Sequence, residues 1–393
     1  MGHGDFTHSR SKGREKPTIW QADQDVDIED LTFVIPIIIS VVLLSVFLIR
    51  KYIRWTVQCP SNNRLDGKTV VITGANTGLG KATAMELAKR GAKVILACRD
   101  RKKGDVVARQ IRIKTTNEEI YSYHLDMSSL VAIKEFVDDF TSREPFLHIL
   151  INNAAYLGPK ATTEDGYERT FGVNYLGHFY LTYLLQDRLK RCASSRVINV
   201  ISDSYTKATL DFEDLAMAKY DIYKAYARSK LAMILFTGEA ARRWMSSHVL
   251  LYGVHPGMVC TDLLRNWPGL TGNILRATSR ILFKSPEDGC QTIVYCAVAN
   301  EIKAQTGKYL ENCQLFKVKK TALDKDMAQK LWELSLHLCK LPPEPKTDSE
   351  VRSIGKHEVK ADELNILFKI YLYSNIGTVK MRFMERKLIR ITN

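Results

Sequence analysis

The sequence has few prolines, no closely paired cysteines and no repeated segment. Only 11 of its 393 residues are proline and 45% are hydrophobic, which argues against a largely disordered chain. The eight cysteines lack a Cys-x-x-Cys pair and the spacings of zinc ligands, so we expect no metal site and reduced thiols in the cytosol, most of them in the core. The length allows two or three average domains, or one large α/β domain with appendages.

One stretch of the chain lacks charge altogether. Residues 31–49, LTFVIPIIISVVLLSVFLI, contain no charged side chain over nearly the length that a helix needs to cross a bilayer. A cleavable signal peptide fits less well, because a long polar segment precedes the run and no small-residue cleavage site follows it. We predict a transmembrane helix over 31–49, between a polar tail (1–30) and a juxtamembrane linker (50–65).

Basic residues predict the orientation of this helix. Arg50, Lys51 and Arg54 follow the span directly, whereas the residues just before it are acidic, so a single-pass protein with its bulk in the cytosol is expected. The net charge of +14 favours an anionic partner such as acidic lipid, a phosphorylated ligand or nucleic acid. Nucleic acid is the weakest of these, because no recognised binding motif is present and the chain carries a membrane anchor.

Strand-like and helix-like patterns alternate between residues 66 and 340. Several of the strand-like runs are almost continuously apolar, which is typical of a parallel sheet covered on both faces. We predict one doubly wound α/β (Rossmann) domain over 66–340 with a sheet of about seven parallel strands. The runs are KTVVITG, KVILACR, IYSYHLDM, LHILINNA, SRVINVISD, LLYGVHPG and GKYLENCQLF.

A different composition begins at residue 341. LPPEPKTDSE (341–350) is polar and Pro-rich, as a linker is, and it opens a C-terminal extension (341–393). The extension contains short segments in which apolar and basic residues alternate. A contact with a membrane surface or a partner, and an ordinary terminal helix packed on the domain, both remain open.

Glycines follow the first predicted strand and precede a helix. Backbone N–H groups in such a turn, with the positive end of the helix, favour a pyrophosphate. A tight structural turn would also need glycine, but the amphipathic helix and second strand that follow favour nucleotide binding. The predicted phosphate-binding residues are Gly74, Asn76, Thr77, Gly78, Leu79 and Gly80.

The glycine spacing, Gly-x-x-x-Gly-x-Gly, resembles that of the short-chain dehydrogenase/reductase family. The resemblance covers about residues 66–340 and looks strongest to the membrane-anchored retinol dehydrogenase group, through TGANTGLG, ACRD, FGVNYLGHF, YARSKLA and HPGMVCTDL. It implies a nicotinamide cofactor and the interconversion of a carbonyl compound and its alcohol.

The end of the second strand bears on which nicotinamide cofactor is used. An acidic residue there would repel a 2′-phosphate, but Cys98 takes that place and Arg99 follows it, so NADP(H) is preferred. Asp100 is the complication, because it lies at a similar distance from the glycines. Its alternative role is to cap the next helix.

The family resemblance implies further cofactor contacts. Asp126 matches the residue that contacts adenine, Asn153 matches one that lines the site, and Pro256 with Gly257 matches the turn over the nicotinamide. Ala155 stands where the family usually has glycine, and its methyl group is expected to crowd the cofactor or the local backbone.

Three tyrosines stand four residues before a lysine. On one helix such a pair shares a face, so the ammonium can stabilise tyrosinate and lower the tyrosine pKa. Only Tyr226 and Lys230 lead into a sustained helical pattern, and only they, with Ser229, match the family motif Tyr-x-x-Ser-Lys. Tyr156 and Lys160 form the second pair, but Gly158 and Pro159 between them disfavour a helix. Tyr220 and Lys224 form the third pair, where a helix is only starting.

The resemblance completes a catalytic set of Asn174, Ser202, Tyr226 and Lys230. Ser202 would bind the carbonyl oxygen, Tyr226 would donate the proton, and Lys230 would hold the nicotinamide ribose and lower the pKa of Tyr226. Asn174 would hold a relay water, although an isolated Asn more often bends or caps a helix. Ser204 is a poorer carbonyl-binding candidate past the strand end. His178 and His255 are interpreted as structural.

The segment after Gly257 predicts the substrate. Residues 263–283 are rich in Leu, Ile and Trp, so they either pack in the core or cover an apolar substrate. The resulting hypothesis is an NADP(H)-dependent oxidoreductase of the endoplasmic reticulum membrane that acts on a lipophilic aldehyde or ketone, with retinal and retinol as first candidates. Steroid, fatty-aldehyde and polyprenoid substrates are alternatives, and homodimerisation stays open. A non-catalytic, cofactor-binding membrane adaptor is the alternative from another class, but it has no need of the complete catalytic set.

Overall fold

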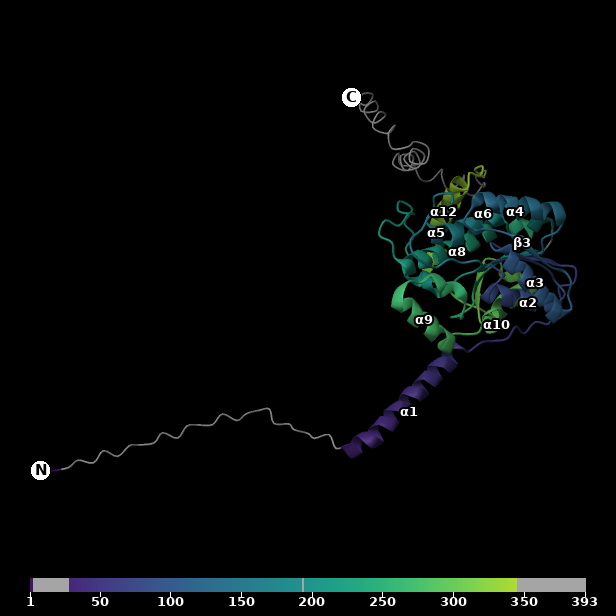
Figure 1. Ribbon diagram of the computed structural model, residues 1–393. Coiled ribbons are helices and arrows are strands. Elements are labelled where there is room, and N and C mark those ends of the chain that lie inside the picture. Colours follow the sequence, from purple (N-terminus) through teal and green to yellow (C-terminus); the bar gives the residue numbers. More distant parts are fainter. Residues whose placement is uncertain (3–27, 193, 345–393) are drawn as a thin grey trace, which may run out of the picture. The chain divides into compact units, whose positions relative to one another are not determined.

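A computed structural model describes residues 1–2, 28–192 and 194–344, and its centre is one eight-stranded sheet (Figure 1). The strand order is β3-β2-β1-β4-β5-β6-β7-β8, and every neighbouring pair from β3 to β7 is parallel. This confirms the predicted doubly wound α/β fold. The strands are β1 (Thr69–Thr73), β2 (Lys93–Cys98), β3 (Ile120–His124), β4 (Ile149–Asn152), β5 (Arg196–Val200), β6 (Leu250–His255), β7 (Lys308–Glu311) and β8 (Gln314–Leu315).

The prediction of a single seventh strand over GKYLENCQLF is wrong, because this run forms a hairpin of two strands. Asn312 and Cys313 have φ angles of 47° and 58°, so the chain turns back between β7 and β8 and pairs antiparallel. Two consecutive residues with positive φ are what a two-residue hairpin loop requires. The sheet therefore has seven parallel strands and a short antiparallel edge.

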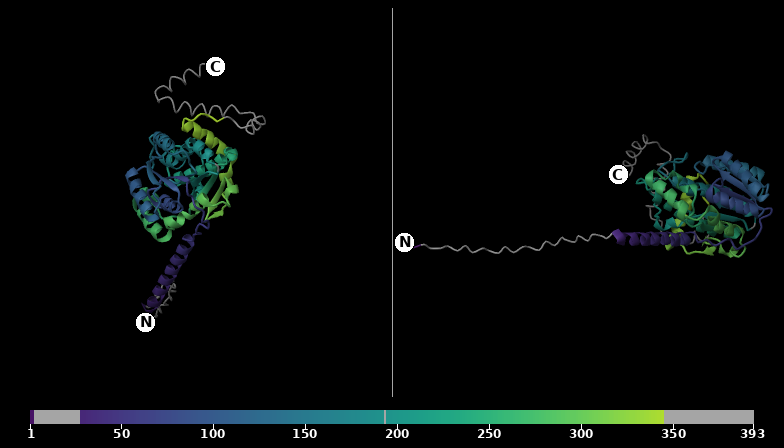
Figure 2. Two further views of the ribbon diagram at one scale, coloured as in Figure 1. Left: turned by 90° about the vertical axis from the view of Figure 1, so that its right-hand side faces the viewer. Right: turned by 60° about the horizontal axis from the view of Figure 1, so that its bottom comes forward.

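Helices cover both faces of the sheet, as Figures 1 and 2 show. Strands β1, β4 and β5 are buried along their whole length, which explains their continuous apolar character. One face packs against α2 (Gly78–Lys89), α3 (Arg101–Thr115) and α11 (Gln291–Val298). The other packs against α4 (Leu130–Arg143), α6 (Gly177–Leu184) and α8 (Ile222–Arg243).

Shorter elements connect these layers. The chain forms two compact units, Met1–Trp332 and Glu333–Asn393, and the sheet lies wholly in the first. The connecting elements are α5 (Arg169–Phe171), the π-helix η1 (Gly172–Leu176), α7 (Gln186–Arg191), η2 (Asp203–Lys207), η3 (Met245–Ser247), η4 (Asp262–Asn266), α9 (Gly269–Leu282), α10 (Pro286–Gly289), η5 (Lys303–Gln305), η6 (Lys320–Leu323) and α12 (Lys325–Leu338).

The charge-free segment forms helix α1 (Ile28–Ile53). Its Phe33–Ile53 portion, 21 residues long, is apolar and long enough to cross a membrane, and its side chains are exposed up to Arg50 and Lys51. The helix runs past the predicted end at residue 49 and takes in the first part of the predicted linker. Residues 3–27 of the polar tail and 345–393 of the C-terminal extension lie outside the described residues.

Candidate active site

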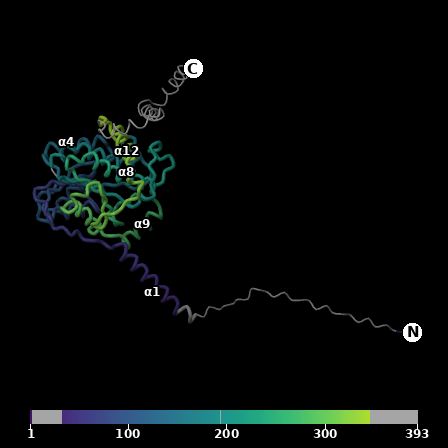
Figure 3. The backbone as a smooth tube through the Cα atoms, turned by 180° about the vertical axis from the view of Figure 1, so that it is seen from behind, coloured from purple at the N-terminus to yellow at the C-terminus, as the bar shows by residue number. Residues whose placement is uncertain are grey.

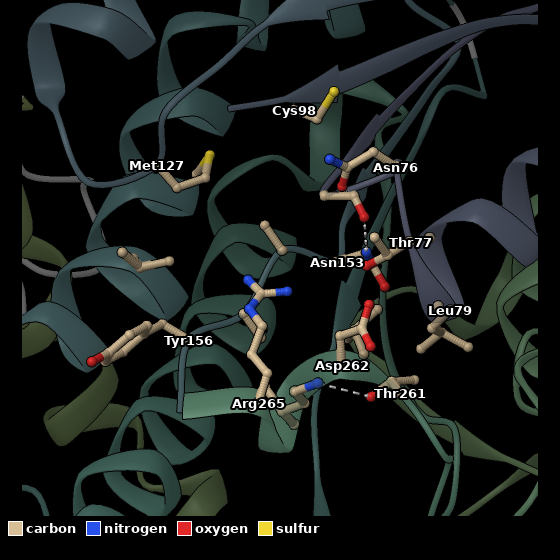
Figure 4. A pocket seen from close by; sticks show the side chains of 18 of the residues that line it. Asn76, Thr77, Leu79, Cys98, Met127, Asn153, Tyr156, Thr261, Asp262 and Arg265 are labelled. Carbon is tan, nitrogen blue, oxygen red and sulfur yellow. Dashed lines mark hydrogen bonds between the residues drawn. The ribbon is translucent and has the colours of Figure 1, made fainter. Parts of the chain in front are cut away.

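A cavity of ≈ 880 Å³ lies at the carboxyl ends of the parallel strands, where doubly wound folds bind their ligands (Figure 4). Every site residue predicted from the sequence lines it except Asn174. The phosphate-binding turn follows β1, and Arg99 follows β2. Asp126 follows β3, and Asn153 follows β4. Ser202 follows β5, Tyr226 and Lys230 lie on α8, and Pro256 and Gly257 follow β6.

The glycine turn has the close approaches that a phosphate cradle needs. Gly74 has φ +66°, and a Cβ there would lie 2.9 Å from the Cα of Ala154. A Cβ on Gly80 would lie 2.5 Å from the carbonyl oxygen of Gly74, so α2 can meet the turn this closely only without a side chain. Thr77, the residue before α2, makes no capping side-chain bond. The first-turn N–H groups of α2 can therefore serve an anion, and the turn fits a dinucleotide.

Polar contacts at the end of β4 hold this turn in place. The Thr73 hydroxyl oxygen accepts hydrogen bonds from the backbone N–H groups of Asn153 and Ala154, both at 2.9 Å. Asn153 Nδ2 donates to the carbonyl oxygen of Thr73 at 2.8 Å. Ala155 is not among the residues with positive φ in the described chain, so its methyl group causes no backbone strain there.

Two basic side chains line the cavity after β2. Arg99 has no ion-pair partner among the described residues, whereas Lys103 pairs with Asp100 at 3.4 Å. Asp100 caps α3 by accepting a hydrogen bond from Lys103 N at 3.0 Å, and this bond lowers the pKa of its carboxyl group. The alternative capping role of Asp100 is therefore confirmed. Asp126 accepts from the backbone N–H and the hydroxyl of Ser128, at 2.9 and 2.7 Å.

Ser202, Tyr226 and Lys230 come together in the middle of the cavity. The Ser202 hydroxyl lies near enough to the Tyr226 phenol to lower its pKa, and it donates a hydrogen bond to Asp203 Oδ1 at 3.3 Å. Lys230 lies one helical turn beyond Tyr226, with its Nζ 5.5 Å from the centre of the tyrosine ring. The same Nζ donates to the carbonyl oxygen of Val200 at 2.7 Å, which ties α8 to the end of β5. A hydroxyl, a phenol and an amine thus face one space.

Burial governs the titration of both α8 groups. It raises the pKa of the Tyr226 phenol well above its ordinary value, and the nearby Ser202 hydroxyl offsets only part of this increase. The lowering of the Tyr226 pKa by Lys230 stays a prediction. Burial also lowers the pKa of the Lys230 amine to about 8. At neutral pH the site presents a protonated phenol beside a charged amine.

The other two tyrosine–lysine pairs do not converge. Tyr220 lies before the start of α8, and its hydroxyl donates to the carbonyl oxygen of Gly158 at 2.8 Å. The backbone N–H of Lys224 donates to Asp221, which caps α8. Tyr156 donates to Pro159, and Lys160 to the carbonyl oxygen of Met217. In each of these pairs the tyrosine hydroxyl and the lysine nitrogen have different partners.

Asn174 lies behind the cavity in the π-helix η1, and its side chain is buried. Its Nδ2 donates to the Ser229 hydroxyl at 3.0 Å and to the carbonyl oxygen of Tyr156 at 2.9 Å, and its Oδ1 accepts from Tyr156 N at 2.6 Å. Asn174 therefore clamps the loop after β4 onto α8. A π-helical turn marks functional sites in many helices. The predicted water contact stays a prediction.

Several polar and charged groups that line the cavity lie outside the predicted set, among them Arg265 and His255. Arg265, on η4, extends its guanidinium into the cavity in Figure 4. His255, interpreted as structural, also lines the cavity, and its buried Nδ1 has no hydrogen-bond partner among the described atoms. The prediction that residues 263–283 pack in the core or cover the substrate did not single out Arg265. His178 is buried between Thr73 and Asn174, in line with a structural role.

Comparison with known proteins gives consistent matches. The family profile described as short chain dehydrogenase matches residues 68–269. Retinol dehydrogenase 13 of Mus musculus is 43% identical over 314 residues, which cover 78% of this chain and 94% of that protein. Retinol dehydrogenase 12 of Homo sapiens is 44% identical over 292 residues, covering 74% and 92%.

The solved structures agree in fold. An uncharacterised protein from Mycobacterium paratuberculosis superimposes with a TM-score of 0.59 at 31% identity, covering 73% of this chain and 98% of that one. The strand order, the glycine turn and the Tyr226–Lys230 arrangement are thus accompanied by extensive sequence similarity. The chain belongs to the short-chain dehydrogenase family.

Proposed function

We propose that this protein is a membrane-anchored, NADP(H)-dependent oxidoreductase that interconverts a lipophilic aldehyde or ketone and its alcohol. The observation that carries the proposal is the meeting of Ser202, Tyr226 and Lys230 in the cavity that the glycine turn opens into. An adaptor that only binds the cofactor would not need these three side chains in one cavity.

The residues of the site account for the proton side of the reaction. A bound nicotinamide supplies or accepts the hydride. The Ser202 hydroxyl donates a hydrogen bond to the carbonyl oxygen of the substrate, and Tyr226 donates its phenolic proton to that oxygen as the negative charge develops. The charged Lys230, 5.5 Å from the ring centre, stabilises the tyrosinate that remains. Asn174 keeps α8 in register with the loop after β4 through Ser229 and Tyr156.

The preference for NADP(H) is supported by Arg99, which lines the cavity and is available to pair with a 2′-phosphate. The carboxylate of Asp100 is engaged as a helix cap and by Lys103. Cys98 stands where an acidic residue would repel the phosphate.

A lipophilic substrate is supported by the cavity wall and by the relatives. The apolar side chains of Val173, Val259 and Leu263 are among those that line the cavity. The relatives are named retinol dehydrogenases, so retinal and retinol are the first candidates, with steroids, fatty aldehydes and polyprenoids as alternatives.

The membrane location is supported by α1. Its apolar length matches a bilayer, and Arg50, Lys51 and Arg54 at its end favour a cytosolic catalytic domain. Reduction in the cytosol at the endoplasmic reticulum is the setting we propose. The domain limits 66–340 and 341–393 are part of the same proposal.

The test is NADPH oxidation by purified membranes that contain the full-length protein. All-trans-retinal, long-chain aldehydes and ketosteroids form the substrate panel, and membranes with the Tyr226→Phe variant form the blank. Oxidation above this blank with at least one substrate is expected. No oxidation with any of them would reject the catalytic function and favour the adaptor.

A further inference from the structure

Helix α9 carries an apolar stripe on its outer side. Leu270, Ile274 and Ile281 are 74%, 54% and 54% exposed, and Ala277 between them is also exposed. These four residues recur at intervals of four, three and four, so they lie along one face of the helix. A surface helix of a soluble domain normally turns polar side chains outward. The outer stripe (Leu270, Ile274, Ala277 and Ile281) therefore needs an explanation.

The opposite face of α9 is packed, so the outer stripe cannot turn inward. Gly272 and Ser279 are buried, and a Cβ at Gly272 would collide with the carbonyl oxygen of Trp267. Arg276 donates from Nη1 to the carbonyl oxygens of Leu264 and Trp267, at 2.9 and 3.1 Å. The orientation of α9 is thus set by its inner contacts.

The end of α9 is tied to the end of α1. Arg54, the first residue after α1, donates from Nε to the carbonyl oxygen of Phe283 at 2.9 Å and from Nη2 to that of Arg280 at 3.2 Å. Figure 3 shows α9 on the side of the domain where α1 joins it. Tyr52 and Trp55 beside this junction are exposed, and Tyr and Trp are enriched where a protein meets the membrane–water interface.

The segment around the outer stripe carries no negative charge. Residues 263–284 contain no acidic residue, and Arg280, one residue before Ile281, is exposed. An apolar stripe within a basic segment is the pattern of a helix that lies in the surface of a membrane, and anionic lipids strengthen its binding. A second copy of the chain is a poorer fit, because a stable dimer buries about 20–30 residues on each side and this stripe has four.

From this placement we propose that α9 lies in the surface of the bilayer that α1 enters, with its outer stripe inserted among the lipids. The inference rests on the proposed membrane anchoring by α1. Because η4 both lines the cavity and directly precedes α9, this contact places one wall of the cavity at the membrane. A lipophilic substrate then enters the cavity from the bilayer and not from water.

Lipid photolabelling of the full-length protein tests the contact without relying on activity. The protein is reconstituted into vesicles of phosphatidylcholine and phosphatidylserine that contain a phospholipid with a diazirine near its glycerol backbone. After irradiation, the labelled peptides are identified by mass spectrometry. We expect labelling of the α9 peptide well above that of peptides from α3 and α4. Labelling of the α9 peptide no higher than that of these peptides would overturn the proposal.

The α1 peptide reports the anchor separately. Labelled α1 with unlabelled α9 would leave the anchor in place and overturn only the α9 contact. Labelled α9 with unlabelled α1 would support the contact and reject the anchor.

A matched pair of variants tests the consequence for the substrate. The variant Leu270→Asp, Ile274→Asp and Ile281→Asp should lose the α9 label and raise KM for a long-chain aldehyde dissolved in the vesicles about tenfold. Its rate with a short, water-soluble aldehyde should not change, because none of these residues lines the cavity. The control variant Ile113→Asp and Val131→Asp changes exposed apolar residues on α3 and α4 and should match the wild type.

Two results with these variants would contradict the proposal. One is an equal KM for the vesicle-dissolved aldehyde in both variants. The other is a change from dimer to monomer in the α9 variant, measured by mass photometry in nanodiscs, with no lipid label on wild-type α9. That combination would assign the outer stripe to a second copy of the chain.

Discussion

Lys230 donates from Nζ to the carbonyl oxygen of Val200 at 2.7 Å, and this bond joins the middle of α8 to the last residue of β5. Ser202 follows Val200 by two residues and lines the same cavity as Tyr226. This backbone contact therefore holds the helix that carries the amine and the phenol against the strand end that carries the serine. It also keeps the amine buried, which is why its pKa is lowered to about 8.

The rate of carbonyl reduction should fall as the pH rises through about 8. Below that pH Lys230 is protonated, and above it the charge that stabilises tyrosinate is lost, while Tyr226 stays protonated because burial raises its pKa. The pH dependence of kcat/KM for NADPH reports the free enzyme and checks this. In Lys230→Arg the fall should move to higher pH, since arginine keeps its charge. An unshifted profile in that variant would mean that another group titrates.

Replacing Tyr226 with Phe should lower kcat by about a thousandfold, because the proton donor is removed. NADPH binding, measured by the fluorescence of the bound cofactor, should be nearly unchanged. Tyr220→Phe is the matched control, because this tyrosine belongs to the neighbouring tyrosine–lysine pair but binds Gly158 and Thr170. It should cost far less activity. A fully active Tyr226→Phe enzyme would reject the mechanism.

Replacing Arg99 with Ala should weaken NADPH binding by about tenfold to a hundredfold, the range expected for a lost hydrogen bond to a charged group. Binding of NADH should hardly change, because NADH has no 2′-phosphate. The control is Arg101→Ala, which removes an exposed arginine two residues away that does not line the cavity. Equal losses for both cofactors, measured by titration, would show that Arg99 does not read the phosphate.

Replacing Glu168 with Gln should destabilise the domain by about 3 kcal/mol, because the buried Arg228 guanidinium would lose its ion-pair partner. The pair is 3.3 Å apart with both side chains almost fully buried. Asp66→Asn is the control, since it breaks the exposed pair of Arg64 and Asp66 and should leave the melting temperature nearly unchanged. Thermal melting of the detergent-solubilised protein measures both. Equal melting temperatures for the two variants would contradict this view of the buried pair.

Much of the fold could be predicted from local pattern. The strand-like runs identified β1 to β6, and β1, β4 and β5 were the clearest because a strand buried on both faces needs apolar residues along its whole length. The hairpin of β7 and β8 was missed, because Asn312 and Cys313 gave no strong turn signal in an otherwise strand-like run. The continuation of α1 to Ile53 was missed as well, since a basic residue ends an apolar run without ending a helix.

The candidate site was predictable where a motif is contiguous. The glycine turn and Tyr-x-x-Ser-Lys depend on spacing within one turn or one helix, so residue numbers were enough to locate them. Two features of the site were not predictable from the sequence. They are the hydrogen bond from Asn174 to Ser229 and the position of the Arg265 side chain in the cavity. Each depends on segments that are distant in the sequence and adjacent only after folding.

The sequence by itself determined the apolar segment of α1, the α/β class, the phosphate-binding turn and a short set of catalytic candidates, because each follows from local composition or spacing. Only the tertiary structure decided which partners Tyr156 and Tyr220 bind, and that burial raises the pKa of Tyr226. It also decided that the apolar face of α9 points outward beside α1. Hydrogen-bond partners and exposure are properties of the packed chain, and no spacing rule contains them.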